Sequence, residues 1–407
     1  MHGKSSPNRP GGRRATSGGR TRLMGYVMMG LALWTFVYLT VWMILLPYVE
    51  DEHWIHNYFP SRSGNFFCLV WGPVMEAVLD VWVLGPILGI SFGILLIMFL
   101  RYLTFHPAKL SLNGSHVLVT GGTRGIGRAV AIAAIRQGAS VTIVARTEKT
   151  LQENADKLRK LCLSSSQKVN WFAADLADID VHQLVHHVEE AEGKVGPIDV
   201  LVNNAGGSSQ ASFEDLTLGT FDSQLRLNFL SAVAMTKAVL PGMKLRRQGR
   251  IVFVSSMAGQ LGLYGYTAYA AAKFALRGLA ESLQMELYPY NIWLTTVHPP
   301  NTETEGFALE LATMPPETRL ISEQGGLYSP ETVARRLLSD ACRGHFHSYL
   351  GLDGWMLTRL TAGMAPSTSV FSMLQELCLG GLLRLIGLFY LRSFYRQVWL
   401  CFKRKRA

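Results

Sequence analysis

The sequence predicts an α/β fold with a doubly wound parallel sheet, preceded by transmembrane helices and followed by a hydrophobic tail. From about residue 112, short runs of β-branched residues alternate with helical patterns, as in successive βαβ units. Two long uncharged runs come before this region. Only 17% of the 407 residues are charged, against roughly 25% in soluble domains, so we expect contact with lipid.

The positive charge of the chain lies in its two ends. The formal net charge is +10, and residues 1–22 and 392–407 each carry six Lys or Arg residues and no acid. Without these twelve cations the rest of the chain has a net charge of 10 − 12 = −2. We therefore expect no nucleic-acid partner, because nucleic-acid binding needs a basic folded surface. Basic ends beside apolar runs indicate membrane topology instead.

The cysteines and histidines do not indicate a metal site. The five cysteines are scattered along the chain without a CxxC pair, and no HExxH pattern occurs. Neither a disulfide framework nor a bound metal is expected.

The region before Arg101 predicts two membrane spans. Residues 1–22 are rich in Gly, Ser, Pro and Arg, which predicts a disordered arm. Residues 23–49 and 81–100 contain no charged residue, and each run is long enough to cross a hydrocarbon core of about 30 Å. The loop 50–80 between them is mainly acidic. By the positive-inside rule this loop is lumenal, while the arm and everything after Arg101 are cytosolic.

The soluble domain is expected at residues 112–350, around seven strands with helices in the gaps. Open α/β sheets bind ligands at the carboxyl ends of their strands, so motifs that follow strands are the candidates for a site. The expected strands are residues 115–120, 140–145, 169–173, 198–202, 249–255, 291–297 and 347–351.

A glycine-rich turn follows the first expected strand. The sequence HVLVT runs into GGTRGIG and then into a helical stretch, so a pyrophosphate can approach the helix N-terminus closely. A glycine-rich connection alone is a weak signal, and its place between a strand and a helix strengthens it. The residues expected to contact a dinucleotide here are Gly121, Thr123, Arg124, Gly125, Ile126 and Gly127.

The end of the second expected strand favours NADPH over NADH. An NAD enzyme has an acid here for the ribose 2′-hydroxyl, whereas this chain has Arg146. A guanidinium can pair with a 2′-phosphate, and Arg124 adds a second cation. Alternatively, Arg146 is only an exposed residue at the end of a strand and binds no phosphate. Lys149 could also contact the 2′-phosphate, although a lysine on a solvent-exposed helix face is the better interpretation.

Two further motifs follow the third and fourth expected strands. They are the pair Asp-Leu and the sequence NNAG, and both lie where an open sheet binds its ligand. Taken alone, NNAG could be an ordinary turn. The cofactor contacts expected from these motifs are Asp175, Leu176, Asn203, Ala205 and Gly206.

A serine, a tyrosine and a lysine indicate carbonyl chemistry. Ser256 follows the fifth strand, Tyr269 lies thirteen residues later, and Lys273 shares a helix face with Tyr269. An ammonium beside the phenol should lower the tyrosine pKa from about 10. Ser256 can donate a hydrogen bond to a substrate oxygen on which negative charge develops. Taken singly, Tyr269 could be a packed aromatic residue and Lys273 a surface lysine.

The order of these motifs resembles the short-chain dehydrogenase/reductase family over residues 112–350. The resemblance implies a Rossmann fold and a catalytic set of Asn228, Ser256, Tyr269 and Lys273, in which Asn228 holds a water for proton relay. It further implies that Tyr269 and Lys273 contact the cofactor and that Thr302 lies near the nicotinamide carboxamide. A catalytically silent scaffold is the remote alternative, and the intact catalytic set argues against it.

Several segments resemble the branch of this family that reduces the 3-ketone of long-chain sphingoid bases. Pro300 stands where the family usually has glycine, and the segments PETRLIS, GLDGWML and GMAPSTS follow. The implied reaction transfers a hydride from NADPH to C3 of the ketone, with Tyr269 as proton donor. Residues 302–328 read as a loop that covers the substrate. A membrane-bound reductase of steroids or retinoids is the alternative.

Residues 351–407 are expected to form a hydrophobic, membrane-associated tail with a basic end. Residues 377–391 are apolar except for Arg384, which suits a re-entrant or interfacial hairpin beside the site. A simple anchor is the alternative. The final residues KRKRA resemble a retrieval signal, which predicts a multi-pass endoplasmic reticulum protein with a cytosolic catalytic domain. The sequence leaves the oligomeric state open, a homo-oligomer included.

Overall fold

The computed structural model describes residues 81–105, 107–178 and 180–406. The chain divides into two compact units, Met1–Ile94 and Leu95–Ala407. The predicted arm, the first predicted span and the predicted lumenal loop lie outside the described residues.

Helix α3, Val81–Tyr102, coincides with the second predicted span. Its apolar side chains from Ile90 to Phe99 are exposed, as expected of a surface that faces lipid rather than a protein core. That α3 crosses a membrane stays a prediction.

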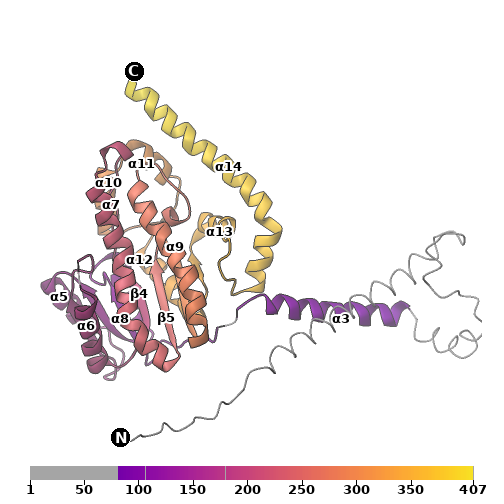
Figure 1. Cartoon of the computed structure of the whole chain (residues 1–407), viewed down its shortest axis with the longest axis horizontal. Coiled ribbons are helices and arrows are strands. Elements are labelled where there is room, and N and C mark those ends of the chain that lie inside the picture. The colour runs from indigo at the N-terminus through magenta and orange to yellow at the C-terminus, as the bar shows by residue number, and fades with distance from the viewer. Residues whose placement is uncertain (1–80, 106, 179, 407) are drawn as a thin grey trace, which may run out of the picture. The chain divides into compact units, whose positions relative to one another are not determined.

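Seven parallel strands form one sheet, of which Figure 1 labels β4 and β5. Their order is β3-β2-β1-β4-β5-β6-β9. The order reverses between β1 and β4, which is where open α/β sheets bind ligands. The predicted doubly wound sheet is confirmed, and every strand begins and ends within two residues of the prediction. The strands are β1 His116–Thr120, β2 Ser140–Ala145, β3 Val169–Ala173, β4 Ile198–Asn203, β5 Gly249–Val254, β6 Ile292–His298 and β9 His347–Tyr349.

Helices cover both faces of this sheet. Val117 and Val119 of β1 belong to one hydrophobic core and Leu118 to the other, because successive side chains of a strand point to opposite faces. The first core is closed by α4 Gly125–Ile135, α5 Glu148–Arg159 and α12 Pro330–Arg343. The second is closed by α6 Val181–Val195, α8 Ser231–Arg246 and α9 Thr267–Leu287. Helix α7, Leu218–Leu225, leads through a π-helical turn, Arg226–Leu230, into α8.

The segment 302–328, predicted to be loop-like, contains regular structure. Strand β7, Asn301–Thr302, pairs with β8, Leu327–Tyr328. Between them lie α10, Glu305–Thr313, and α11, Pro316–Ser322. The Thr304 hydroxyl accepts a 3.0 Å hydrogen bond from the Phe307 amide and so caps α10, and Pro316 occupies the first position of α11. Both helices are too short to show a clear apolar period in the sequence.

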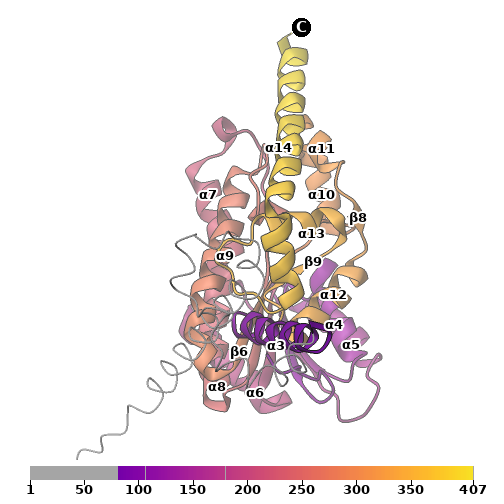
Figure 2. The same cartoon turned by 90° about the vertical axis from the view of Figure 1, so that its right-hand side faces the viewer.

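The tail forms one uninterrupted helix, so the predicted hairpin is wrong. After α13, Gly351–Leu360, helix α14 runs from Val370 to Arg406 and packs against α13 and α11 (Figure 2). No proline interrupts it, and a helix tolerates the internal glycines at modest cost. Residues Val370–Arg404 are long and apolar enough to cross a membrane, judged by length and composition.

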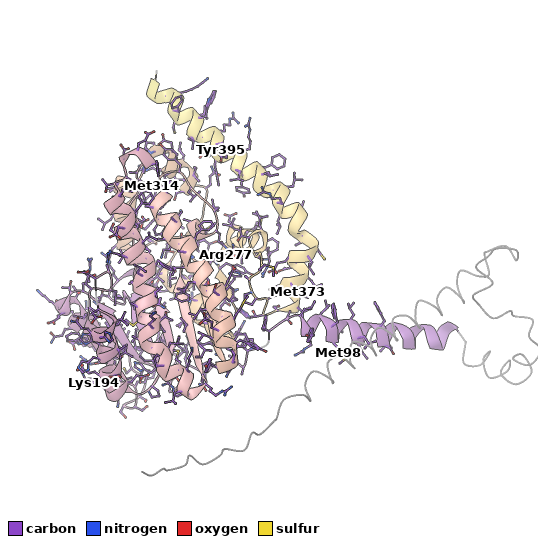
Figure 3. All side chains as sticks on the ribbon, viewed as in Figure 1. Met98, Lys194, Arg277, Met314, Met373 and Tyr395 are labelled. Atoms are coloured by element: carbon purple, nitrogen blue, oxygen red, sulfur yellow. The ribbon has the colours of Figure 1, made fainter. Side chains whose placement is uncertain are left out.

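Polar contacts fix the start of α14 to the rest of the unit. Arg359 of α13 donates hydrogen bonds to Glu376 Oε1 at 2.7 Å, to Ser372 Oγ at 2.9 Å and to the Tyr349 hydroxyl at 3.1 Å. Arg277 of α9 donates to the carbonyl of Ala362 at 3.1 Å, in the segment between α13 and α14 (Figure 3). The start of the tail helix is therefore positioned by α13, and α13 and the segment after it are held by Tyr349 and by Arg277 of α9.

Candidate active site

A cavity of about 1390 Å³ lies at the carboxyl ends of the strands. Its lining includes the glycine-rich turn, the ends of β2, β4 and β5, helix α10 and one side of α14. The dinucleotide motifs and the apolar tail helix therefore border the same space.

The glycine-rich turn has the backbone that a pyrophosphate site needs. Gly121 and Gly125 have φ angles of +65° and +53°, which favour glycine. A Cβ atom at Gly127 would clash with the Gly121 carbonyl oxygen, so Gly127 keeps the turn close to α4. Helix α4 begins at Gly125 without a side-chain cap, which leaves amide groups of its first turn available to an anion. Of the predicted residues here, the cavity is lined by Gly121, Thr123, Arg124, Gly125 and Ile126.

The two arginines predicted to bind a 2′-phosphate, Arg124 and Arg146, both line the cavity. Arg124 and Arg146 are exposed and line the cavity, together with Asp175 and Leu176. Lys149 is also exposed, but it is not among the described residues that line the cavity. Of the two residues, Arg146 lines the cavity and Lys149 does not; contact of Arg146 with the cofactor stays a prediction.

In the NNAG motif, the second asparagine lines the cavity, whereas the first does not. The buried Asn203 donates a 3.1 Å hydrogen bond to Thr236 Oγ1 on α8, and its contact with the cofactor stays a prediction. Asn204 lines the cavity with Ala205 and Gly206. Its side chain donates to the Thr120 carbonyl at 3.0 Å, which joins the end of β4 to the end of β1.

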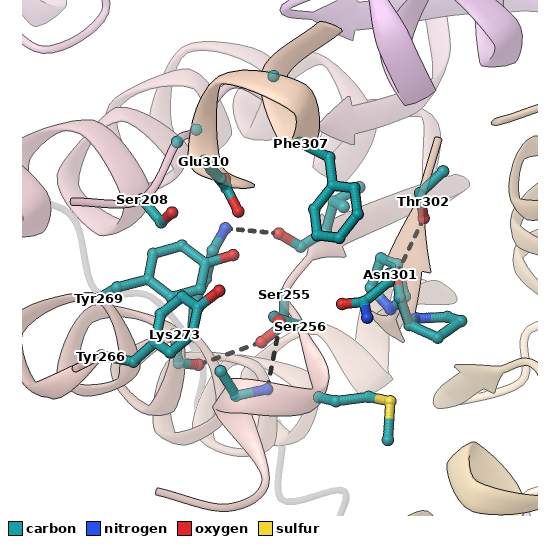
Figure 4. A pocket seen from close by; sticks show the side chains of 18 of the residues that line it. Ser208, Ser255, Ser256, Tyr266, Tyr269, Lys273, Asn301, Thr302, Phe307 and Glu310 are labelled. Atoms are coloured by element: carbon teal, nitrogen blue, oxygen red, sulfur yellow. Dashed lines mark hydrogen bonds between the residues drawn. The ribbon is translucent and has the colours of Figure 1, made fainter. Parts of the chain in front are cut away.

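The structure brings Ser256, Tyr269 and Lys273 together, and all three line the cavity (Figure 4). Ser256 follows β5, and Tyr269 and Lys273 lie on α9. Lys273 Nζ lies 5.5 Å from the centre of the Tyr269 ring and donates a 2.9 Å hydrogen bond to the Val254 carbonyl. Ser256 Oγ accepts a 3.1 Å hydrogen bond from the Ala258 amide, which leaves its own hydroxyl proton free to be donated.

Burial is the largest cause of the pKa shifts of Tyr269 and Lys273. It raises the pKa of Tyr269 above its usual value; the negative charge of Glu310 adds to the rise, and hydrogen bonding by Ser256 opposes it. Burial also lowers the pKa of Lys273 to about 8. The expected lowering of the Tyr269 pKa is not found in this structure, in which loss of hydration and the charge of Glu310 raise that pKa; the influence of Lys273 on Tyr269 stays a prediction.

Asn228 lies behind the cavity, in the π-helical turn. Its buried side chain donates to the Gly207 carbonyl at 2.9 Å and to the Gln224 carbonyl at 3.1 Å, and it accepts from the Gly207 amide at 3.2 Å. These bonds fix the loop that leads from the NNAG motif to Ser208 on the cavity wall. The role of Asn228 in holding a water stays a prediction.

Comparison with known proteins assigns the chain to a family. A sequence model of the short chain dehydrogenases matches residues 115–313. A 3-ketodihydrosphingosine reductase of Bos taurus is 48% identical over 299 residues, which are 74% of this chain and 90% of that protein. The chain belongs to the short-chain dehydrogenase family.

Other relatives of this short-chain dehydrogenase have similar names. A 3-dehydrosphinganine reductase of Danio rerio is 48% identical over 295 residues, covering 72% of this chain and 89% of that protein. The 3-dehydrosphinganine reductase TSC10B of Arabidopsis thaliana is 35% identical over 287 residues, covering 70% and 84%. Separately, residues 20–92 match a model of the dolichol phosphate-mannose biosynthesis regulatory protein. The resemblance to the short-chain dehydrogenases is confirmed, and the family model covers residues 115–313 of the predicted domain 112–350.

Membership of the family gives the class of chemistry. The protein is an oxidoreductase that acts between a ketone and an alcohol, and reductases of this family use nicotinamide cofactors. The left-handed glycines, the uncapped start of α4 and the cation at the end of β2 suit a dinucleotide. Thr302 is buried on the cavity wall, and its hydroxyl donates to the Pro300 carbonyl at 2.9 Å.

One charged residue of the site was not predicted from the sequence. Glu310 of α10 lines the cavity near Tyr266 and Tyr269 (Figure 4). It belongs to no motif, and the only sequence signal is an acid between two leucines in a short apolar segment, EGFALELAT.

Proposed function

We propose that this short-chain dehydrogenase reduces 3-ketodihydrosphingosine to dihydrosphingosine with NADPH. The observation that carries the proposal is a single cavity that joins the Ser256 and Tyr269 pair to the apolar side of α14. A substrate with one polar, reactive end and a long alkyl chain suits such a space. The names of the relatives that are 47–48% identical support the same substrate.

The cofactor is proposed to bind along the predicted contacts. When bound, NADPH supplies the hydride that is added to the substrate carbonyl carbon. Arg124 and Arg146 would hold its 2′-phosphate, while the amides at the start of α4 would hold its pyrophosphate. The remaining part of the proposed cofactor site is lined by Ala205, Gly206 and Thr302.

The proposed catalytic roles follow from the hydroxyl groups on the cavity wall. Tyr269 donates the proton to the carbonyl oxygen, and Ser256 donates a hydrogen bond to the same oxygen as its negative charge grows. Lys273 then stabilises the tyrosinate that remains. Asn228 keeps the Gly207 backbone in place, and with it the neighbouring Gly206, which lies close to Lys273 Nζ.

The alkyl chain is proposed to lie along α14. Leu383, Ile386, Leu391 and Phe394 of this helix line the cavity, and the helix is apolar enough to enter a membrane. A substrate held in the bilayer could then reach Tyr269 without passing through water, which would avoid exposing its chain.

We further propose the location and topology. The chain would be a multi-pass endoplasmic reticulum protein with a cytosolic arm 1–22, spans at 23–49 and 81–100, a lumenal loop 50–80, a catalytic domain 112–350 and a membrane-associated tail 351–407. The match of residues 20–92 to a biosynthesis regulatory protein supports a membrane segment there. Protease protection of both termini in sealed microsomes tests this arrangement, and a lumenal catalytic domain would contradict it.

Product analysis tests the reaction. The purified full chain in detergent, supplied with NADPH, should convert 3-ketodihydrosphingosine to dihydrosphingosine. Retinal and a ketosteroid serve as parallel substrates. Reduction of either of these without reduction of 3-ketodihydrosphingosine would overturn the proposed substrate.

A further inference from the structure

Glu310 introduces a negative charge into the reactive part of the cavity. Its carboxylate is half-buried on α10, on the side of the cavity where Tyr266 and Tyr269 lie (Figure 4). Its charge raises the pKa of both tyrosines and also that of Lys273. Glu310 is therefore within electrostatic reach of the hydroxyl that is proposed to deliver the proton.

Neutral groups hold this carboxylate in place. Gln210 Nε2 donates to Glu310 Oε2 at 3.3 Å, and the same nitrogen donates to the Tyr266 hydroxyl at 3.0 Å. The hydroxyl and the backbone of Ser208 lower the pKa of Glu310 and so favour its ionised form. The carboxylate is thus oriented by donors that carry no charge.

Glu310 forms no close ion pair within the described part of the chain. Among residues 81–105, 107–178 and 180–406, no lysine, arginine or histidine lies within ion-pair distance of its carboxylate. Burial raises the pKa of Glu310, and the charge of Lys273 opposes this rise from a greater distance, while Lys273 Nζ itself donates a hydrogen bond to the Val254 carbonyl. A partly buried carboxylate without a directly bonded cation is unfavourable, so the site is complementary to a cation that comes from outside the chain.

The proposed substrate carries such a cation next to its reactive carbon. A sphingoid-base ketone has an amine on the carbon that neighbours the carbonyl carbon. The carbonyl makes this amine less basic than a simple alkylamine, and a nearby carboxylate favours its protonated form. When the carbonyl oxygen contacts Tyr269 and Ser256, the ammonium must therefore lie close to the same hydroxyl groups, within the field of Glu310.

We propose that Glu310 binds the substrate ammonium and makes the enzyme selective for 2-amino ketones. This inference rests on the proposed function and adds a specificity residue to it. The carboxylate accepts a charge-assisted hydrogen bond from the ammonium, which fixes the rotation of the substrate about the bond between its amino carbon and its carbonyl carbon. A long-chain ketone without the amine lacks this contact.

Two substrates and three variants test the assignment. The substrates are 3-ketodihydrosphingosine and the same long-chain hydroxyketone without its amine. Glu310→Gln should lower kcat/KM for the amino ketone about 10- to 100-fold, mainly through KM, and should change the amine-free ketone less than about threefold. Glu310→Asp keeps the charge and should recover part of the preference. Glu305→Gln, an exposed residue of α10 outside the cavity lining, should leave both substrates unchanged.

The possible failures are distinguishable. Equal losses on the two ketones in Glu310→Gln, or no loss on either, would overturn the role of Glu310 and leave the proposed function intact. A wild-type chain that reduces neither ketone would contradict the proposed function. Calorimetric binding of dihydrosphingosine then tests Glu310 without turnover: tighter binding to the wild type than to Glu310→Gln supports the assignment, and equal binding overturns it.

Discussion

Lys273 Nζ lies 5.5 Å from the centre of the Tyr269 ring and is held there by the Val254 carbonyl at 2.9 Å. The hydrogen bond to the end of β5 therefore holds the lysine beside the Tyr269 ring, and both residues line the cavity. Glu310 of α10 lines the same cavity, and its charge raises the pKa of Tyr269. Tyr269 thus shares the cavity wall with a lysine beside its ring and with a carboxylate from α10.

Tyr269→Phe tests the proton donor. Removal of the hydroxyl should lower kcat by about 10²- to 10⁴-fold, the usual contribution of a general acid, while the ring keeps its packing. The measurement is NADPH oxidation with the ketone substrate, alongside the thermal midpoint as a control for folding. Unchanged turnover would contradict the proposed chemistry and would favour another donor such as Tyr266.

The pH dependence of reduction should follow Lys273. Burial lowers its pKa to about 8, so the ammonium loses its proton as the pH rises through this value. Neutral Lys273 no longer stabilises the tyrosinate that forms when Tyr269 gives up its proton, and the rate of reduction should therefore fall above about pH 8. The measurement is kcat against pH with saturating cofactor. A rate that stays flat to well above that pH in a protein that remains folded would contradict this assignment.

Arg146→Ala should weaken the preference for NADPH. Loss of the guanidinium removes a charge-assisted contact to the 2′-phosphate, so KM for NADPH should rise about 10- to 100-fold with little change for NADH. Lys149→Ala is the matched control, because Lys149 is exposed nearby in sequence but outside the cavity lining. Equal effects on both cofactors, or a larger effect of Lys149→Ala, would show that Arg146 does not bind the phosphate.

The sheet could be predicted because its strands are buried on both faces. Val117, Leu118 and Val119 form a continuous apolar run whose side chains enter two cores, and such runs are typical of parallel sheets. The positions of Ser256, Tyr269 and Lys273 then follow from their places at the end of a strand and on the next helix. Long periodic patterns and fixed spacing were sufficient for this part of the site.

The orientation and surroundings of individual side chains could not be predicted in the same way. Asn203 and Asn204 are equivalent in the sequence, and the side chain of the first points to Thr236. Arg384 suggested an interrupted tail, whereas it lies on a continuous helix and lines the cavity. Glu310 belongs to no pattern at all. In each case the deciding contact comes from an element far away in the chain.

The tail helix should determine how the enzyme treats chain length. Leu391 of α14 lines the cavity, whereas Leu388 is 46% exposed and outside the lining. Leu391→Gln places an amide against the alkyl chain and removes apolar contact, so kcat/KM for a long-chain ketone should fall about tenfold. A short-chain analogue should be nearly unaffected.

Leu388→Gln is the matched control, since it makes the same change on the same helix away from the cavity. It should leave the ratio of kcat/KM values for the long and short ketones unchanged, even where it alters binding to detergent or lipid. If Leu388→Gln lowers that ratio as much as Leu391→Gln does, α14 acts only as an anchor. If Leu391→Gln alone lowers it, the helix that is long and apolar enough to enter a membrane also forms the wall along which the substrate chain reaches Tyr269.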